Sequence, residues 1–162
     1  MIKRSITIIV LTTSLCLMGI AAEKDAEESV SLDKIPAAAA KTLKEHAGGA
    51  KITAVSQEKD EGKTVYEATF TAKGRVHDVT VDENGKLVSD EEVVPLTEAP
   101  KAVRAAIERE MPGGKVEKFE RIKEGGKLSY EALISAKGKR EEIKFDAAGK
   151  VLEREDKTGK KD

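Results

Sequence analysis

The spacing of apolar positions changes from a helical to a strand-like period at one place in each half of the chain. Residues 36–46 are alanine-rich, begin at Pro36 and end at a Gly-Gly pair, which predicts a helix. In Thr97–Met111 apolar residues recur at helical spacing, Thr97 is a candidate N-cap and Pro112 follows, which predicts a second helix. Beyond each break, apolar and polar residues alternate, as is typical of half-buried strands.

The alternating segments also predict how the strands pair. The strand at Thr64–Ala72 is followed, after only Lys73-Gly74, by a second strand at Arg75–Val81. A two-residue loop of this kind fixes the register of a hairpin. The predicted register pairs Ala72 with Arg75, Phe70 with His77, Ala68 with Val79 and Tyr66 with Val81. In the second half it pairs Tyr130 with Phe145, Ala132 with Ile143 and Glu131 with Lys144.

The two halves resemble one another. Sliding the chain along itself by 64 residues aligns Leu32–Val88 with Leu96–Leu152 without a gap. Roughly seventeen of about 57 aligned positions are identical, which indicates an internal duplication. Shorter strands are predicted at Lys51–Glu58, Lys86–Ser89, Lys115–Lys123 and Lys150–Glu153. The predicted fold is therefore α+β, with two tandem repeats, each one helix packed on a four-stranded antiparallel sheet.

The segments outside the repeats have their own composition. Residues 1–22 combine a basic start, an apolar run and small residues at the end, which is typical of a cleaved signal peptide. The alternatives are a retained membrane anchor, for which the apolar run is short, and lipid attachment at Cys16. The predicted boundaries are an acidic leader at 23–31, repeats at 32–88 and 96–152, a linker at 89–95 and a disordered charged tail at 153–162.

Composition limits the classes of partner. Cys16 is the only cysteine, so cleavage of the signal peptide leaves a chain without disulfides or thiol chemistry. Removal of Lys3 and Arg4 changes the formal net charge from -1 to about -3, with both signs mixed along the chain. This near-neutral balance argues against electrostatic capture of nucleic acid or of a membrane surface.

A set of short motifs resembles one known family. Both repeats contain a proline-started helix, a Gly-Gly or Pro-Gly-Gly break, the segment Gly-Lys-x-x-Tyr-Glu-Ala and a closing Asp-x-x-Gly-Lys. This order resembles the PepSY-like, or β-lactamase-inhibitor-like, domain family. The resemblance implies an exported, non-enzymatic module with a helix packed on an antiparallel sheet, which binds or inhibits other proteins. It also implies a looser kinship with the bacterial β-lactamase-inhibitor protein, in which two such units form a concave binding surface.

The sheet face away from the helices is the predicted partner-binding surface. The chain has no tryptophan, and the hairpin tyrosines and phenylalanines are assigned to the helix-covered side. Aromatic hot spots are therefore scarce, and binding through this face would depend on polar and charged groups. The candidate residues are Glu67, Thr69, Asp78, Thr80, Glu131, Leu133, Arg140, Glu142 and Lys144.

The leading functional hypothesis is an exported binding module, periplasmic or secreted, whose partner is another exported protein such as an enzyme or protease that it inhibits or regulates. The alternative is a periplasmic small-ligand or cation-binding protein that uses the acidic loops. No residue suggests a nucleophile or an acid–base pair, so we predict no enzyme activity, no catalytic or metal-binding residues and no cofactor. His46 and His77 are replaced by glutamate in the other repeat, and Asp82–Gly85 has the composition of a hairpin turn.

Overall fold

The computed structural model describes residues 28–60 and 62–159, so the predicted signal peptide at 1–22 lies outside the described residues. Within them, three helical segments and nine strands follow one another along the chain. The helical segments are α1 (Ala37–Ala47), the 3-10 turn η1 (Leu96–Glu98) and α2 (Lys101–Glu110). The strands are β1 (Glu28–Ser29), β2 (Ile52–Asp60), β3 (Lys63–Ala72), β4 (Arg75–Asp82), β5 (Leu87–Val93), β6 (Lys115–Glu124), β7 (Lys127–Ala136), β8 (Lys139–Asp146) and β9 (Val151–Asp156).

All of the described strands belong to one antiparallel sheet in the order β1 to β9. The predicted fold class, α+β with two tandem repeats of one helix packed on a four-stranded antiparallel sheet, is therefore wrong. Strand β5 continues past the predicted end at Ser89 and pairs with β6 from Ser89 opposite Glu124 to Val93 opposite Glu120. The physical reason is that a sheet edge leaves backbone groups unpaired, and pairing two such edges satisfies both.

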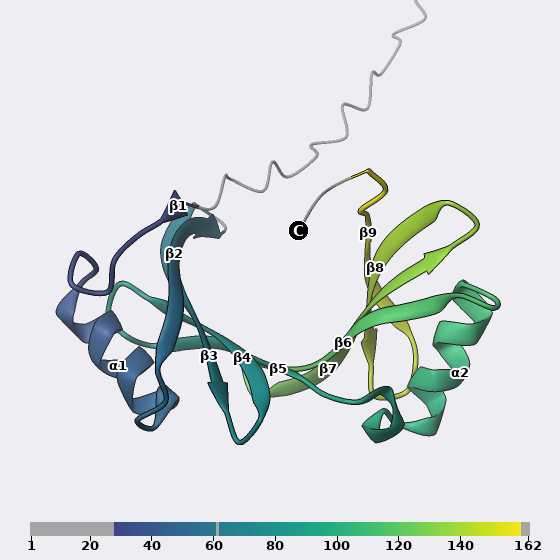
Figure 1. The fold of residues 1–162 in the computed structure, drawn as a ribbon, viewed down its shortest axis with the longest axis horizontal. Coiled ribbons are helices and arrows are strands. Elements are labelled where there is room, and N and C mark those ends of the chain that lie inside the picture. The colour runs from purple at the N-terminus through teal and green to yellow at the C-terminus, as the bar shows by residue number, and fades with distance from the viewer. Residues whose placement is uncertain (1–27, 61, 160–162) are drawn as a thin grey trace, which may run out of the picture.

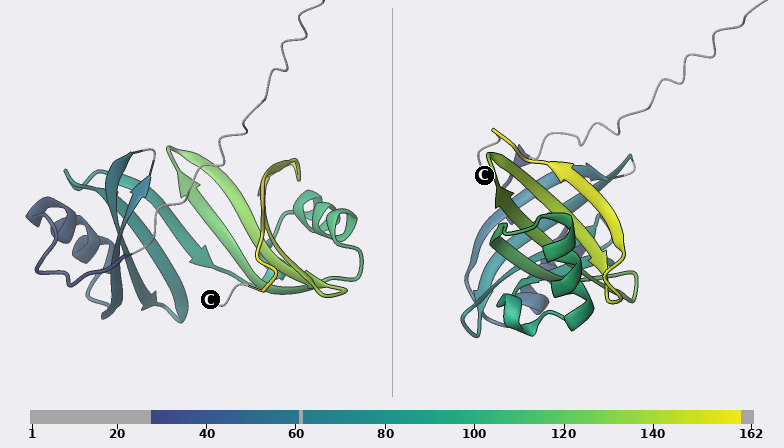
Figure 2. Two further views of the ribbon diagram at one scale, coloured as in Figure 1. Left: turned by 90° about the horizontal axis from the view of Figure 1, so that it is seen from above. Right: turned by 90° about the vertical axis from the view of Figure 1, so that its right-hand side faces the viewer.

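The sheet is strongly curved, and both helices lie on its outer side. Figure 1 shows the strands following a U, with α1 outside one arm and α2 outside the other. A view from above shows the same two helices at opposite ends of the molecule, with the sheet running between them (Figure 2). The inner face of the U is consequently covered by neither helix.

Proline determines where each helix begins. Pro36 and Pro100 occupy the positions immediately before α1 and α2, and neither helix has a side-chain cap at its N-terminus. Thr97, the predicted N-cap of the second helix, lies instead within η1. Ala99 is extended because the residue before a proline is disfavoured in helical conformation, and α2 starts only after Pro100.

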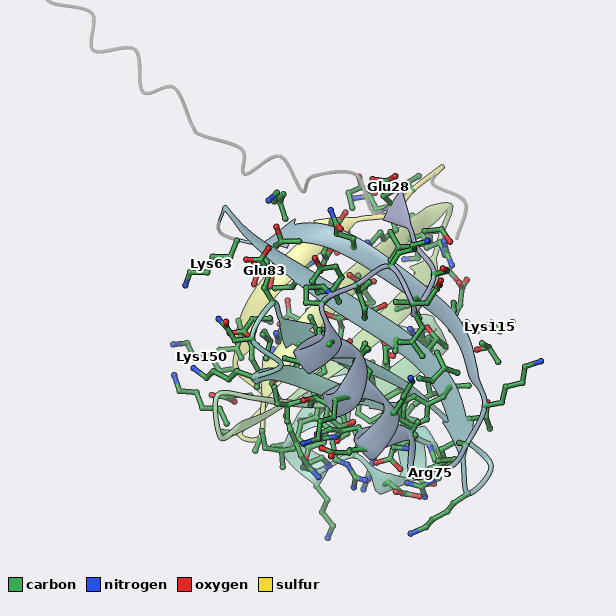
Figure 3. The ribbon with its side chains drawn as sticks, turned by 90° about the vertical axis from the view of Figure 1, so that its left-hand side faces the viewer. Glu28, Lys63, Arg75, Glu83, Lys115 and Lys150 are labelled. Carbon is green, nitrogen blue, oxygen red and sulfur yellow. The ribbon has the colours of Figure 1, made fainter. Side chains whose placement is uncertain are left out.

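Each helix buries its apolar side against one arm of the sheet. Leu43 of α1 packs in a cluster with Phe70 and other residues of β2 to β4, and Val103 of α2 packs with Phe145 and other residues of β6 to β8. Figure 3, viewed from the side of α1, shows this helix lying across the sheet, with charged side chains such as that of Lys115 toward the margin. The two cores are separate although the sheet is continuous.

The predicted hairpin registers are confirmed. In β3–β4, Phe70 lies opposite His77 and Tyr66 opposite Val81; in β7–β8, Tyr130 lies opposite Phe145. The rings of Phe70 and His77 stack, with centroids 5.3 Å apart. The hairpin loops have the positive φ angles that a tight two-residue turn needs.

Two segments predicted to lack structure form strands. Most of the predicted linker at 89–95 belongs to β5, and residues 153–156 of the predicted disordered tail belong to β9. Neither segment has the contrast of apolar and polar positions that marks a half-buried strand, and both are held by backbone pairing with a neighbouring strand. The predicted domain limits themselves stay predictions.

A charged cluster holds the outer side of the β5–β6 junction. The Glu92 carboxylate accepts a hydrogen bond of 2.8 Å from Arg75 on β4 and another from Arg121 on β6. Arg75 also donates to Glu98 of η1, at 2.6 Å. Burial alone would raise the pKa of Glu92, but these two arginines lower it overall, so the carboxylate stays ionised.

Two turn glycines, Gly85 and Gly149, lie against α1 and α2 and should be among the least replaceable residues. A Cβ at Gly149 would lie 2.5 Å from the carbonyl oxygen of Ala102 in α2, and φ is +79°. Gly138 has a similar φ of +81° but open space around it. We predict that Gly149→Ala lowers the free energy of unfolding by about 3 kcal/mol and Gly138→Ala by about 1 kcal/mol, as measured by urea denaturation. Equal losses in the two variants would show that the α2 contact has no effect.

Candidate functional site

The inner, concave face of the sheet carries all nine predicted partner-binding residues. Along each strand they alternate with residues of the two cores, and therefore project away from the helices. Glu67 lies opposite Thr80, and Glu131 lies opposite Lys144. We call this surface the concave face; its predicted members are Glu67 and Thr69 on β3, Asp78 and Thr80 on β4, Glu131 and Leu133 on β7, and Arg140, Glu142 and Lys144 on β8.

The β5 and β6 strands add residues to the concave face that the sequence analysis missed. Glu91 of β5 lies opposite Asp78, and Glu120 of β6 lies opposite Glu131, so both fill the space between the two predicted groups. Glu91 was missed because residues 89–95 were predicted to be a linker. Glu120 was missed because a bulge between Val116 and Lys118 interrupts the alternation, and that bulge has no clear signal in the sequence.

Side chains on β3 and β4 form short polar contacts across the hairpin. The Thr69 hydroxyl donates to Asp78 Oδ1 at 2.6 Å, and the Thr80 hydroxyl lies 3.5 Å from Glu67 Oε2. Thr80 is buried, which is unusual for a threonine on a sheet face with no covering layer. This part of the concave face is therefore ordered by its own hydrogen bonds.

The other arm of the concave face carries both lysines and their acidic partners. Glu120 is only 4% exposed, and its Oε1 lies 2.8 Å from Lys118 Nζ. Lys144 Nζ lies 3.1 Å from Glu124 Oε2 at the end of β6. Each lysine thus has a carboxylate within contact distance.

Farther along β8, opposite charges pair with one another. Arg140 Nε donates to Glu117 at 2.8 Å. Lys157 Nζ lies 3.4 Å from Glu142 and 2.8 Å from Glu155. The charges at this end of the concave face are therefore compensated locally, in contrast to its centre.

Carboxyl groups at the centre of the concave face titrate at unusually high pH. Burial raises the pKa of Glu91 to about 7, and the negative charge of Glu120 adds to the shift. Burial likewise raises the pKa of Glu131 to about 8, with further contributions from Glu142 and Glu91. The pKa of Glu120 is also raised, because burial outweighs the effect of Lys118. Near neutral pH these three carboxyl groups together therefore carry fewer than three negative charges.

Among residues 28–60 and 62–159, the remaining candidates for function are a metal site, the two histidines and the helices. No group of three or more histidine and acidic side chains is arranged to hold a metal ion in this part of the chain. His77 stacks on Phe70 and lies 3.4 Å from Asp90, whereas His46 is exposed in the last turn of α1. Neither α1 nor α2 is long and apolar enough to cross a membrane.

The raised pKa of Glu131 predicts a specific dependence of stability on pH. Its carboxyl is protonated in the folded state up to about pH 8 and loses its proton near pH 4.5 when unfolded. The contribution of this carboxyl group to the free energy of unfolding is therefore fully present below pH 4.5. It is lost as the pH rises toward 8. We predict that Glu131→Gln increases the free energy of unfolding at pH 9 by about 2 kcal/mol and flattens this fall.

The measurement is urea denaturation between pH 4 and 9. The control is Glu45→Gln on the exposed side of α1, where we expect a change below about 0.5 kcal/mol at every pH. A wild-type pH dependence that persists in Glu131→Gln would contradict the assignment of this shift to Glu131.

Two family models match the chain. The model described as "Peptidase propeptide and YPEB domain" matches residues 29–91, and the model described as "Putative beta-lactamase-inhibitor-like, PepSY-like" matches residues 66–153. The matches overlap within β3 to β5 and do not coincide with the predicted repeats at 32–88 and 96–152. No functionally curated protein matches the chain.

Solved structures from Bacteroides species share the fold. A DUF2874 family protein of Bacteroides uniformis is 21% identical, with 78% of this chain and 92% of that chain covered and a TM-score of 0.64. A "putative periplasmic" protein of Bacteroides eggerthii is 20% identical, covers 76% and 90%, and has a TM-score of 0.65. A BLIP-like protein of Bacteroides fragilis is 23% identical, covers 78% and 90%, and has a TM-score of 0.58.

These comparisons confirm the family resemblance that the sequence motifs indicated. The PepSY-like family model matches more than half of the sequence. The chain belongs to the PepSY-like, β-lactamase-inhibitor-like family.

Proposed function

We propose that the protein is an exported, non-enzymatic module that binds another exported protein through the concave face. One observation carries the proposal: the concave face runs without interruption across the β5–β6 junction, and neither helix covers it. The two arms of the sheet thus offer one surface to a partner. Two sheets turned away from each other would not.

Family membership supports a binding role and an exported location. The description of one matched family names a peptidase propeptide, and that of the other is β-lactamase-inhibitor-like. Both descriptions refer to binding of another protein rather than to catalysis. The B. eggerthii protein is described as periplasmic and the B. fragilis protein as BLIP-like. In line with these, we propose a periplasmic or secreted location after cleavage of the segment at 1–22, and inhibition or regulation of an exported enzyme or protease as the specific role.

The chemistry of the concave face favours recognition by charge and hydrogen bonds. Glu67, Glu131 and Lys144 present ionisable groups, and Thr69 and Thr80 present hydroxyls. The aromatic residues Tyr66 and Tyr130 are buried on the other side, in the cores. Charged surfaces of this type determine partner specificity and the rate of association more than raw affinity.

Affinity capture tests the proposal. The tagged mature protein is incubated with envelope extract, and bound proteins are quantified by mass spectrometry. We expect a specific exported partner that is retained by the wild type and reduced at least about tenfold by Glu67→Ala combined with Glu131→Ala. The matched control combines Glu45→Ala and Glu108→Ala, which remove the same number of carboxyl groups from the outer helices.

The outcome separates the concave face from the rest of the surface. Loss of the partner in the concave-face variant but not in the helix variant supports the proposal. Equal retention in both variants, or equal loss in both, would contradict it. A captured enzyme or protease is then assayed with and without the mature protein, and unchanged activity would contradict the inhibitory role.

A further inference from the structure

We propose that the centre of the concave face receives a basic segment of the partner protein, with a lysine or arginine side chain seated against the carboxylates of Glu91, Glu120 and Glu131. This inference rests on the proposed function and adds the chemistry of the partner. Three features of the centre support it: its charge, two carboxylates without an ion-pair partner among the described residues, and its coupling to protons.

The charge of the concave face is unbalanced at its centre. The strands from β3 to β8 place five acidic residues there against two basic ones. Both basic residues already lie beside carboxylates, Lys118 with Glu120 and Lys144 with Glu124. The five acidic residues are Glu67, Asp78, Glu91, Glu120 and Glu131, whereas Glu142 and Arg140 lie at the end of the face where opposite charges pair. A surface of this composition is complementary to a basic segment.

Two of the central carboxylates have no partner of their own. Among the described residues, neither Glu91 nor Glu131 makes a hydrogen bond or an ion pair, although both are more than half buried. A carboxylate removed from water without a counter-charge is unfavourable. An arginine or lysine from a partner would supply the missing hydrogen-bond donors and the missing charge together.

Neighbouring strands bring the three carboxylates together. Glu120 lies directly opposite Glu131 in the β6–β7 pair, and like charges at this spacing repel each other. On β5, Glu91 lies close enough to Glu120 that the negative charge of Glu120 raises the pKa of Glu91. A cation placed among the three would replace these repulsions with attractions, because each carboxylate would then have an opposite charge beside it.

Binding of a cation should release protons. The charged groups around Glu91 and Glu131 are Asp78 from β4, Lys118 and Glu120 from β6, and Glu142 and Lys144 from β8. Because the pKa values of Glu91 and Glu131 are about 7 and about 8, part of the population carries protons near neutral pH. A nearby cation lowers both pKa values, so protons pass to the buffer and binding tightens as the pH rises from 6.5 to 8.5.

The test uses a defined peptide and the mature protein. The probe is an eight-residue peptide with three arginines, and its control has citrulline, which has nearly the same shape but no charge, in place of each arginine. Isothermal titration calorimetry at low salt is run at pH 6.5 and 8.5, in buffers with different ionisation enthalpies. We expect the arginine peptide to bind at least about tenfold more tightly than the citrulline peptide, with about tenfold tightening from pH 6.5 to 8.5 and measurable proton release.

Protein variants locate the binding. Glu91→Gln combined with Glu131→Gln should weaken binding of the arginine peptide at least about tenfold and abolish proton release. The control, Glu45→Gln combined with Glu108→Gln, removes the same number of carboxyl groups from the outer helices and should leave the affinity and the proton release unchanged. Circular dichroism checks that each variant is folded.

Several results would overturn the inference. These are no binding of the arginine peptide, equal binding of the citrulline peptide, equal weakening in both glutamine variants, or binding that does not tighten with pH. If partner capture still depends on Glu67 and Glu131, any of these results removes only the basic-segment inference and leaves the proposed function standing. If capture does not depend on them, the proposed function is wrong, whatever the peptide does.

Discussion

The backbone pairing of β5 with β6 is the constraint on which the rest of the molecule depends. Without it, each helix and the strands under it would be a small unit with its own core and two exposed sheet edges, near the lower size limit for independent folding. With it, the strands form one sheet of nine. On the outer side, Glu92 connects Arg75 and Arg121 across the junction, so side chains reinforce what the backbone begins.

The same junction brings together the acidic side chains of the concave face. Glu91 on β5 lies near Glu120 on β6 only because the two strands are paired, and the β6–β7 pair places Glu131 opposite Glu120. Their mutual repulsion and partial burial destabilise the free protein at high pH. A cost of this kind is common at sites that bind a partner, where the partner supplies the compensating charge.

The local structure could be predicted from the sequence, and the connection between the halves could not. Alternation at Tyr66, Ala68 and Phe70 and the two-residue loop fixed the hairpin register, since turn length and burial agreed on one solution. Leu87–Val93 has no such contrast, because its outer side faces Arg75 and Arg121 rather than a helix. The nine predicted residues project from the concave face and stay candidates for partner binding. Two central residues were missed, Glu91 because its strand lacks this contrast and Glu120 because of the bulge in β6.

Amide hydrogen exchange measured by NMR tests the single sheet most directly. If β5 and β6 are paired as described, the hydrogen-bonded amides of Ser89–Val93 and Glu120–Glu124 exchange as slowly as those of the β3–β4 hairpin. Rapid exchange of the amides that point across the β5–β6 junction, with protection retained in the pairs β4–β5 and β6–β7, would mean that the halves are separate sheets. In that case the continuous concave face would not exist in solution.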